Sequence, residues 1–134
     1  RPPLPPLLAL QLNRFRYQGA RLRKSLAHVA LPATLDLRDF VATEEQQRQL
    51  LPHLARGASC SPPPGVEDSA LAYGLYAVCV HRGATMQQGH YIAFANAGPS
   101  LEAEEWYAFN DAQVWPCTRA DALRAEAYIA FYRR

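Results

Sequence analysis

Short segments in which hydrophobic and polar residues alternate, or hydrophobic residues run together, are separated by glycine, proline and charged residues. Strict alternation is typical of a strand with one buried face, and a short apolar run is typical of a strand buried on both faces. Segment 71–81 is largely apolar on both faces, with Leu75 on one and Val78 on the other, and is predicted to be a central strand. The pattern predicts strands at 7–15, 28–31, 35–37, 71–81, 90–96, 105–110 and 127–132.

Two short helices are predicted between these strands. Thr43, followed by acidic residues, resembles the N-cap of a helix that Pro52 would end. Thr118, with Asp121 three residues later, resembles the cap of a second helix. Residues 56–69 are rich in Gly, Ser and Pro and are predicted to be an exposed loop insertion. Strands joined by turns, with two short helices, predict an α+β fold dominated by antiparallel pairing.

Composition describes an ordinary globular chain of 134 residues, the length of one domain. Hydrophobic residues make up 49% and charged residues 19%, and the net charge is +2. The basic residues are scattered along the sequence, which argues against a nucleic-acid partner, and no apolar run is long enough for a membrane helix. The proline-rich start at residues 1–6 does not resemble a signal peptide, so a cytoplasmic or nuclear location is expected.

The three cysteines, Cys60, Cys79 and Cys117, are widely spaced and form no C-x-x-C pair. This spacing predicts reduced thiols, with neither a disulfide framework nor a zinc site, and no other cofactor is indicated. The chain lacks an initiator methionine and begins in the middle of a hydrophobic pattern, which suggests that it was cut from a longer protein.

The candidate chemistry lies on two neighbouring predicted strands. Gly89, His90 and Tyr91 open the first strand, and Asn110 and Asp111 end the second. A histidine beside a flexible glycine, with a carboxamide and a carboxylate on the next strand, is a common arrangement of a general base and its orienting partner. A lone histidine in a strand is more often a structural residue, so the residues alone leave both interpretations open.

Other polar residues receive structural interpretations. His81 ends its strand before the turn at Arg82 and Gly83 and is predicted to be a strand-end polar residue. Arg14 and Arg16 are predicted to be solvated at a strand end, with contact to an acidic partner as the alternative.

Several motifs occur in a fixed order over nearly the whole chain, at 10–15, 29–32, 35–37, 73–81, 89–91, 106–111 and 127–132. The most specific are Gly-His-Tyr, then Trp-Tyr-x-Phe-Asn-Asp, then a closing Ala-Tyr-x-x-Phe-Tyr. This order resembles the C-terminal half of the catalytic domain of ubiquitin-specific proteases, a papain-like family of deubiquitinating cysteine peptidases. The resemblance implies a papain-like α+β fold with a mainly antiparallel palm sheet, of which residues 1–134 form the C-terminal part.

The resemblance also implies roles for the candidate residues. His90 would be the general base that deprotonates the attacking cysteine and later protonates the leaving amine of the ubiquitin–lysine bond. Asn110 occupies the position of the residue that orients the imidazole, and Asp111 is the second candidate for that role. Neighbouring strand residues point to opposite faces, so Asn110 and Asp111 are not expected to face His90 together.

Three further residues are implied to contact substrate. Gly89 would give the Gly-Gly tail of ubiquitin room to approach, and Tyr91 would pack beside it. Trp106 is a candidate for lining the channel of that tail, with a place in the core as the alternative.

The family's nucleophile lies in an N-terminal Gly-Asn-Thr-Cys-Tyr box, which this sequence does not contain, and none of its cysteines fits that role. The resemblance therefore implies a thiol-dependent deubiquitinase in which this chain supplies the base and an upstream part of the same domain supplies the nucleophile. Its partners would be ubiquitin and ubiquitinated proteins. The alternative is a catalytically inactive relative that binds ubiquitin or a scaffold protein.

Overall fold

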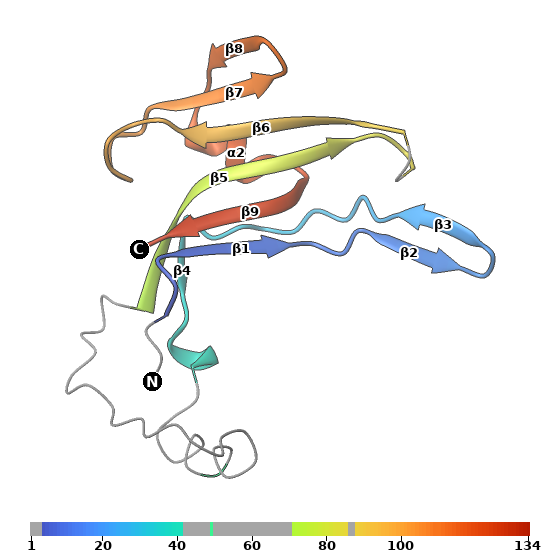
Figure 1. Cartoon of the computed structure of the whole chain (residues 1–134), viewed down its shortest axis with the longest axis horizontal. Helices are drawn as coiled ribbons and strands as arrows, with labels where there is room; N and C mark the ends of the chain where they lie inside the picture. The colour runs from blue at the N-terminus through green and yellow to red at the C-terminus, as the bar shows by residue number, and fades with distance from the viewer. Residues whose placement is uncertain (1–3, 42–48, 50–70, 86–87) are drawn as a thin grey trace.

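The long apolar segment predicted to be central forms β5 (Ala72–Arg82). It pairs with β9 along one edge, and with β4 and then β6 along the other edge. The computed structural model describes residues 4–41, 49, 71–85 and 88–134. Within these residues one seven-stranded antiparallel sheet has the order β1-β9-β5-β6-β7-β8, with β4 paired to the start of β5 (Figure 1). Its other strands are β1 (Leu7–Gln11), β4 (Thr34–Asp36), β6 (His90–Asn96), β7 (Trp106–Asn110), β8 (Gln113–Pro116) and β9 (Ala127–Arg133).

Two irregularities in β5 change which of its side chains are buried. Leu75 and Val78, predicted to lie on opposite faces, are both buried, because the register with β9 shifts between Leu75 and Ala77. A second shift follows Cys79, after which the next two residues of the strand are both buried. A bulge inserts an extra residue and so breaks the strict alternation that the sequence pattern assumes.

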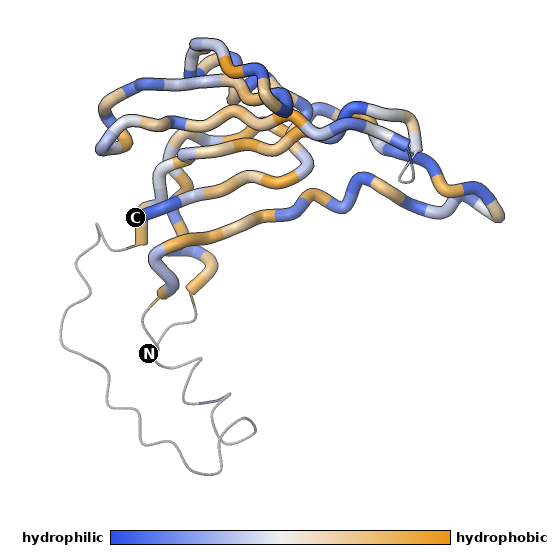
Figure 2. The backbone as a smooth tube through the Cα atoms, turned by 45° about the horizontal axis from the view of Figure 1, so that its top comes forward, coloured by the Kyte–Doolittle hydropathy of each residue, from blue (hydrophilic) through white to orange (hydrophobic). Residues whose placement is uncertain are grey.

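The hydrophobic core lies on the face of the sheet that α2 (Arg119–Arg124) covers. Thr118 caps α2 as predicted, because its side chain accepts from the backbone of Asp121 while the Asp121 carboxylate accepts from the backbone of Thr118. Ala122 of the helix is fully buried against the core. Figure 2 shows hydrophobic residues along the central strands and hydrophilic ones gathered in the connections. The buried cluster consists of Tyr73, Leu75, Val78, Val80, Ile92, Trp106, Ala122, Ala127, Ala130 and Tyr132.

The strand predicted at 7–15 is interrupted. After β1 the chain leaves the sheet and forms a separate hairpin of β2 (Phe15–Gln18) and β3 (Arg21–Lys24), which projects beyond the main sheet (Figure 1). Arg14, at the point of departure, is only 4% exposed and donates to the carbonyl oxygens of Ala127, at 2.6 Å, and Ala27, at 2.7 Å. The prediction that Arg14 is solvated is therefore wrong.

Other differences from the predicted elements have local causes. Residues 28–31 form no strand: pairing with β5 begins only at Ala33, whose carbonyl accepts from Leu75, and Pro32 has no N–H to donate. Strand β8 and a short 3₁₀ helix (Arg38–Phe40) carry no strong pattern and were missed. The helix predicted to open at Thr43 and the loop at 56–69 lie outside the described residues. No helix among the described residues is long and apolar enough to cross a membrane.

Candidate active site

Two neighbouring strands bring His90 and Asn110 together. Strands β6 and β7 are antiparallel, with Ala93 opposite Phe109, so the register sets Asn110, the last residue of β7, opposite Ile92 and diagonal to His90 on the same face. The Nε2 atom of His90 makes a short hydrogen bond with the Oδ1 atom of Asn110. Because an amide oxygen only accepts, Nε2 carries the proton in this pair, and Nδ1 is left with a lone pair that can take one.

Asp111 also lies beside the imidazole. Its Oδ2 atom is 3.8 Å from Nε2 of His90, and its side chain is 83% exposed, compared with 45% for His90. The expectation that Asn110 and Asp111 face opposite ways is wrong, because β7 ends at Asn110 and Asp111 adopts a left-handed backbone with φ +52° in the following turn. The carboxamide and the carboxylate therefore flank the same ring nitrogen.

The backbone just before His90 rests on a second histidine. The imidazole of His81 is 2% exposed, and a Cβ atom built on Gly89 would overlap its Nε2 atom. The Tyr91 ring packs edge-on against His81, with the ring centroids 5.0 Å apart. Residue 89 must be glycine for the chain to pass this close to the ring. His81 is thus a buried support rather than a strand-end polar residue, and only the close approach in three dimensions reveals this.

The three residues predicted to contact substrate are placed differently. Gly89 and Tyr91 flank His90, and Tyr91 is 52% exposed. Trp106 is 2% exposed, belongs to the core and pairs with Asn96 at the opposite end of β7 from Asn110. The structure does not bring Trp106 to His90, and its part in lining a tail channel stays a prediction.

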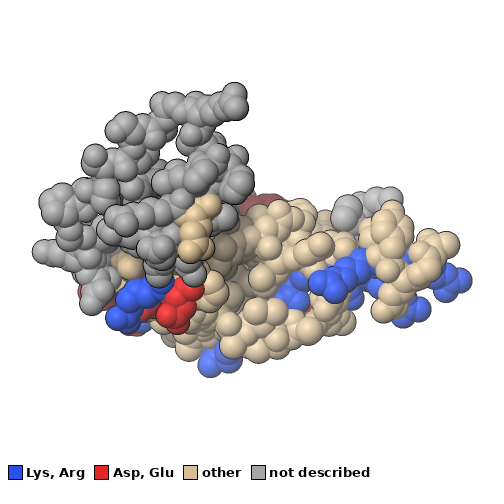
Figure 3. All heavy atoms as spheres, turned by 90° about the horizontal axis from the view of Figure 1, so that it is seen from below, with Lys and Arg blue, Asp and Glu red and all other residues tan. Residues whose placement is uncertain are grey.

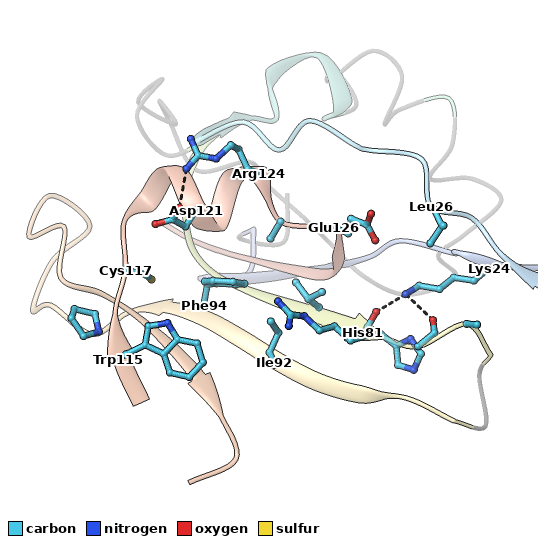
Figure 4. A pocket seen from close by; sticks show the side chains of 16 residues that line it. Lys24, Leu26, His81, Ile92, Phe94, Trp115, Cys117, Asp121, Arg124 and Glu126 are labelled. Carbon is cyan, nitrogen blue, oxygen red and sulfur yellow. Dashed lines mark hydrogen bonds and ion pairs between the residues drawn. The ribbon is translucent and has the colours of Figure 1, made fainter. Parts of the chain in front are cut away.

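A mostly apolar groove of about 930 Å³ opens on the face of the sheet that α2 covers (Figure 4). Ile92 and Phe94, which follow His90 at alternate positions of β6, form its floor, and Trp115 of β8 is 44% exposed at its side. Lys24 closes one end, where its Nζ atom donates to the carbonyl oxygens of His81, at 2.5 Å, and Gly83, at 3.2 Å (Figure 4). The one sequence signal for this groove is Trp115, an apolar residue that lies outside the predicted strands.

Neither described cysteine is suited to be a nucleophile. Burial raises the pKa of the Cys79 thiol. Burial, and then the negative charge of Asp121, raise the pKa of the Cys117 thiol. A catalytic thiol needs the opposite shift, because the thiolate is the reactive form. No group of three or more potential metal ligands occurs among the described residues.

A mostly antiparallel sheet with few helices is the fold expected for the C-terminal part of a papain-like cysteine peptidase domain. The sequence profile described as "Ubiquitin carboxyl-terminal hydrolase" matches residues 2–132. The chain belongs to the ubiquitin carboxyl-terminal hydrolase family.

Curated relatives match nearly all of this chain. It is 36% identical to human ubiquitin carboxyl-terminal hydrolase 31, and the match covers 98% of this chain and 10% of the relative. It is 30% identical to ubiquitin carboxyl-terminal hydrolase 51 of Mus musculus, covering 98% of this chain and 18% of the relative. It is also 30% identical to ubiquitin carboxyl-terminal hydrolase 8 of Saccharomyces cerevisiae, covering 96% and 24%. The chain therefore spans only a minor part of the relatives it matches.

Solved structures share the fold. The SAGA Ubp8/Sgf11/Sus1/Sgf73 DUB module bound to ubiquitin aldehyde matches with a TM-score of 0.69 and 25% identity, covering 97% of this chain and 24% of that one. The same kind of module bound to monoubiquitin matches with a TM-score of 0.69 and 26% identity, covering 97% and 23%. The predicted α+β papain-like fold is confirmed.

Proposed function

We propose that this chain is the base-bearing part of a thiol-dependent deubiquitinase that cleaves the bond after the C-terminal glycine of ubiquitin. The observation that carries the proposal is the His90–Asn110 pair, which leaves Nδ1 of His90 free to accept a proton. His90 takes the proton of the attacking thiol, and the thiolate adds to the glycine carbonyl carbon. The imidazolium then protonates the departing amine, and His90 next activates the water that hydrolyses the thioester.

The nucleophilic cysteine and its oxyanion donors belong to an upstream part of the same catalytic domain. The raised pKa values of the Cys79 and Cys117 thiols support this assignment against the described cysteines. The groove is floored by Ile92 and Phe94, two and four residues after His90 on β6, and its lining is mostly apolar with a few charged residues such as Arg124. It suits an apolar segment that would bring the thiol to the imidazole.

Ubiquitin is the proposed partner. Two of the matched structures hold monoubiquitin or ubiquitin aldehyde according to their descriptions. In this chain Gly89 leaves space beside the base and Tyr91 offers a half-exposed ring, features that suit a glycine-rich extended tail.

The test is to treat the full-length protein with ubiquitin that carries a C-terminal electrophile and to identify the modified cysteine by peptide mass spectrometry. We expect an adduct on a cysteine upstream of Arg1, formed far more slowly in His90→Ala. An adduct on Cys79 or Cys117 would contradict the proposal. No adduct from folded protein that still binds ubiquitin would favour the alternative, an inactive relative that acts as a ubiquitin-binding module.

A further inference from the structure

The β2–β3 hairpin, which we call the arm (residues 15–24), concentrates positive charge. Arg16, Arg21 and Arg23 are exposed on it and form no hydrogen bond or ion pair with any described residue. Residues 1–35 contain six Lys or Arg and no Asp or Glu, whereas residues 36–134 contain eight basic and twelve acidic residues. Figure 3 shows the Lys and Arg atoms along this projection. The basic residues are scattered in sequence, but the fold gathers them.

The register places like charges directly opposite each other. Arg16 pairs with Arg23, and Gln18 pairs with Arg21, so all four side chains share one face of the arm. Like charges at directly opposed positions destabilise a hairpin. A two-stranded hairpin has little stability of its own, and an anion bound between the two guanidinium groups would remove the repulsion.

A polar pocket of about 560 Å³ lies at the root of this face. Its lining includes Arg14, Arg16, Arg23 and Lys24, with no carboxylate. Arg14 is only 4% exposed, and hydrogen bonds from its Nε and Nη1 atoms hold it in place. Its Nη2 atom has no hydrogen-bond partner among the described residues. A buried guanidinium with an unused donor, next to the exposed ones of Arg16 and Arg23, is suited to bind a carboxylate or phosphate oxygen.

We propose that this face of the arm binds an acidic protein segment. Each strand of the arm has four residues, so the face is only about 13 Å long at roughly 3.3 Å per residue. A few carboxylate or phosphorylated side chains of one extended peptide fill that length. A long nucleic acid would continue onto the rest of the chain, where acidic residues outnumber basic ones by four, twelve against eight.

The arm also adjoins the candidate active site. Lys24, at its root, holds the carbonyl oxygens of His81 and Gly83, on the turn that leads to His90. A segment on the arm would therefore lie close to the bond that is cleaved. The identity of the occupant rests on the proposed function: a segment bound this close to the cleaved bond is an acidic segment of the ubiquitin-modified protein.

The test is fluorescence anisotropy of the full-length protein with a labelled Glu-rich peptide of about ten residues, long enough to span the face at 3.3 Å per residue. We expect binding that weakens as salt shortens the Debye length, and that is at least about tenfold weaker in Arg16→Gln/Arg23→Gln. The matched control is Arg38→Gln/Arg119→Gln, which removes the same charge far from the arm and should bind normally. A Gln-rich peptide should not bind.

Three outcomes would overturn the inference: equal peptide binding by the arm variant and the control, no peptide binding at all, or tighter binding of an oligothymidylate that the arm variant abolishes. The last would assign the arm to nucleic acid. The His90→Ala variant should bind the peptide normally, and the arm variant should still react with the ubiquitin electrophile. Failure of the arm and failure of the proposed catalysis are therefore separate results.

Discussion

The two ends of the β6–β7 strand pair each carry an asparagine, and the two are used differently. Asn96, at one end, is 8% exposed; its Nδ2 atom donates to the carbonyl oxygens of Ser100 and Leu101, both at 3.3 Å, and its Oδ1 atom accepts from the backbone of Gly98 at 3.0 Å. Asn110, at the other end, is half-buried and makes one hydrogen bond, to the imidazole of His90.

The difference shows how the same residue type serves structure or chemistry. Burial requires that the polar atoms of Asn96 be satisfied, and the backbone of one loop satisfies them completely. Asn110 lies where solvent reaches, so its amide can remain partly unused while, under the proposed function, it orients a ring that would exchange protons. Substitutions at the first end should therefore change stability, and substitutions at the second should change turnover.

The largest expected effect is that of His90→Ala. Turnover of a ubiquitin-fluorophore substrate by the full-length protein should fall about 10³-fold, because a general base typically contributes 10²–10⁴-fold. The free energy of unfolding should change by less than about 0.5 kcal/mol, since the side chain is half-exposed. A loss of turnover under tenfold would contradict the distinction between the two ends. So would a fall in the free energy of unfolding well above about 0.5 kcal/mol.

Gly89→Ala should reduce turnover about 10²-fold, because the new methyl group overlaps His81 Nε2 and displaces the backbone that carries the base. His81→Ala in the same protein removes the overlap with the imidazole and leaves only the Arg82 carbonyl oxygen, at 2.9 Å, so it should restore part of the activity. Gly98→Ala, at the other end, meets the Cβ atom of Ala103 and should lower stability instead of turnover. No rescue by the second substitution would argue against this packing explanation.

Asn96→Ala should lower the free energy of unfolding by about 2 kcal/mol, because it leaves the Gly98 N–H and two carbonyl groups without their partner. Denaturant unfolding measures this. Below its melting range the variant should turn over substrate within about twofold of the wild type, because Asn96 lies at the far end of the sheet from His90. Stability that is unchanged would contradict the structural role.

Asn110→Ala should lower turnover about tenfold, which corresponds to about 1.4 kcal/mol and to the loss of one hydrogen bond that fixes the ring. Stability should be nearly unaffected. Asn110→Asp keeps an acceptor and should retain more activity than Asn110→Ala. The reverse order would show that Asn110 does not orient His90 through its oxygen.

The smallest effect is expected from Asp111→Asn. Its carboxylate is 3.8 Å from the imidazole and largely solvated, so it is worth well under about 1 kcal/mol at physiological salt. Turnover should change less than about threefold. A larger loss would make Asp111, rather than Asn110, the main partner of the base.

The parts that sequence could predict are those that local pattern determines. The bounds of β6 agree with the prediction because apolar residues and turn signals delimit that strand, and the cap of α2 follows from Thr118 and Asp121. The His90–Asn110 contact agrees with what the family resemblance implied. The burial of Arg14 and of His81 could not be predicted, because their surroundings come from residues far away in sequence.

Backbone irregularities account for the remaining differences. The bulges in β5 place Leu75 and Val78 together although a regular strand separates them. The positive φ of Asp111 turns its carboxylate toward His90 although strand alternation predicts the opposite. Both depend on one or two residues whose conformation the hydrophobic pattern does not report.

The pairing of the first strand with the last has a consequence for how the sheet assembles during synthesis. Strand β9 lies between β1 and β5, with Leu7 opposite Arg133 and Leu75 opposite Tyr132. Until β9 has been synthesised, β1 has no partner in the sheet and one edge of the central strand is bare. Contacts so distant in sequence close slowly, and an unpaired apolar edge is a site for aggregation. The strand pair that carries His90 and Asn110 is thus synthesised before β9, the strand that joins β1 to the rest of the sheet.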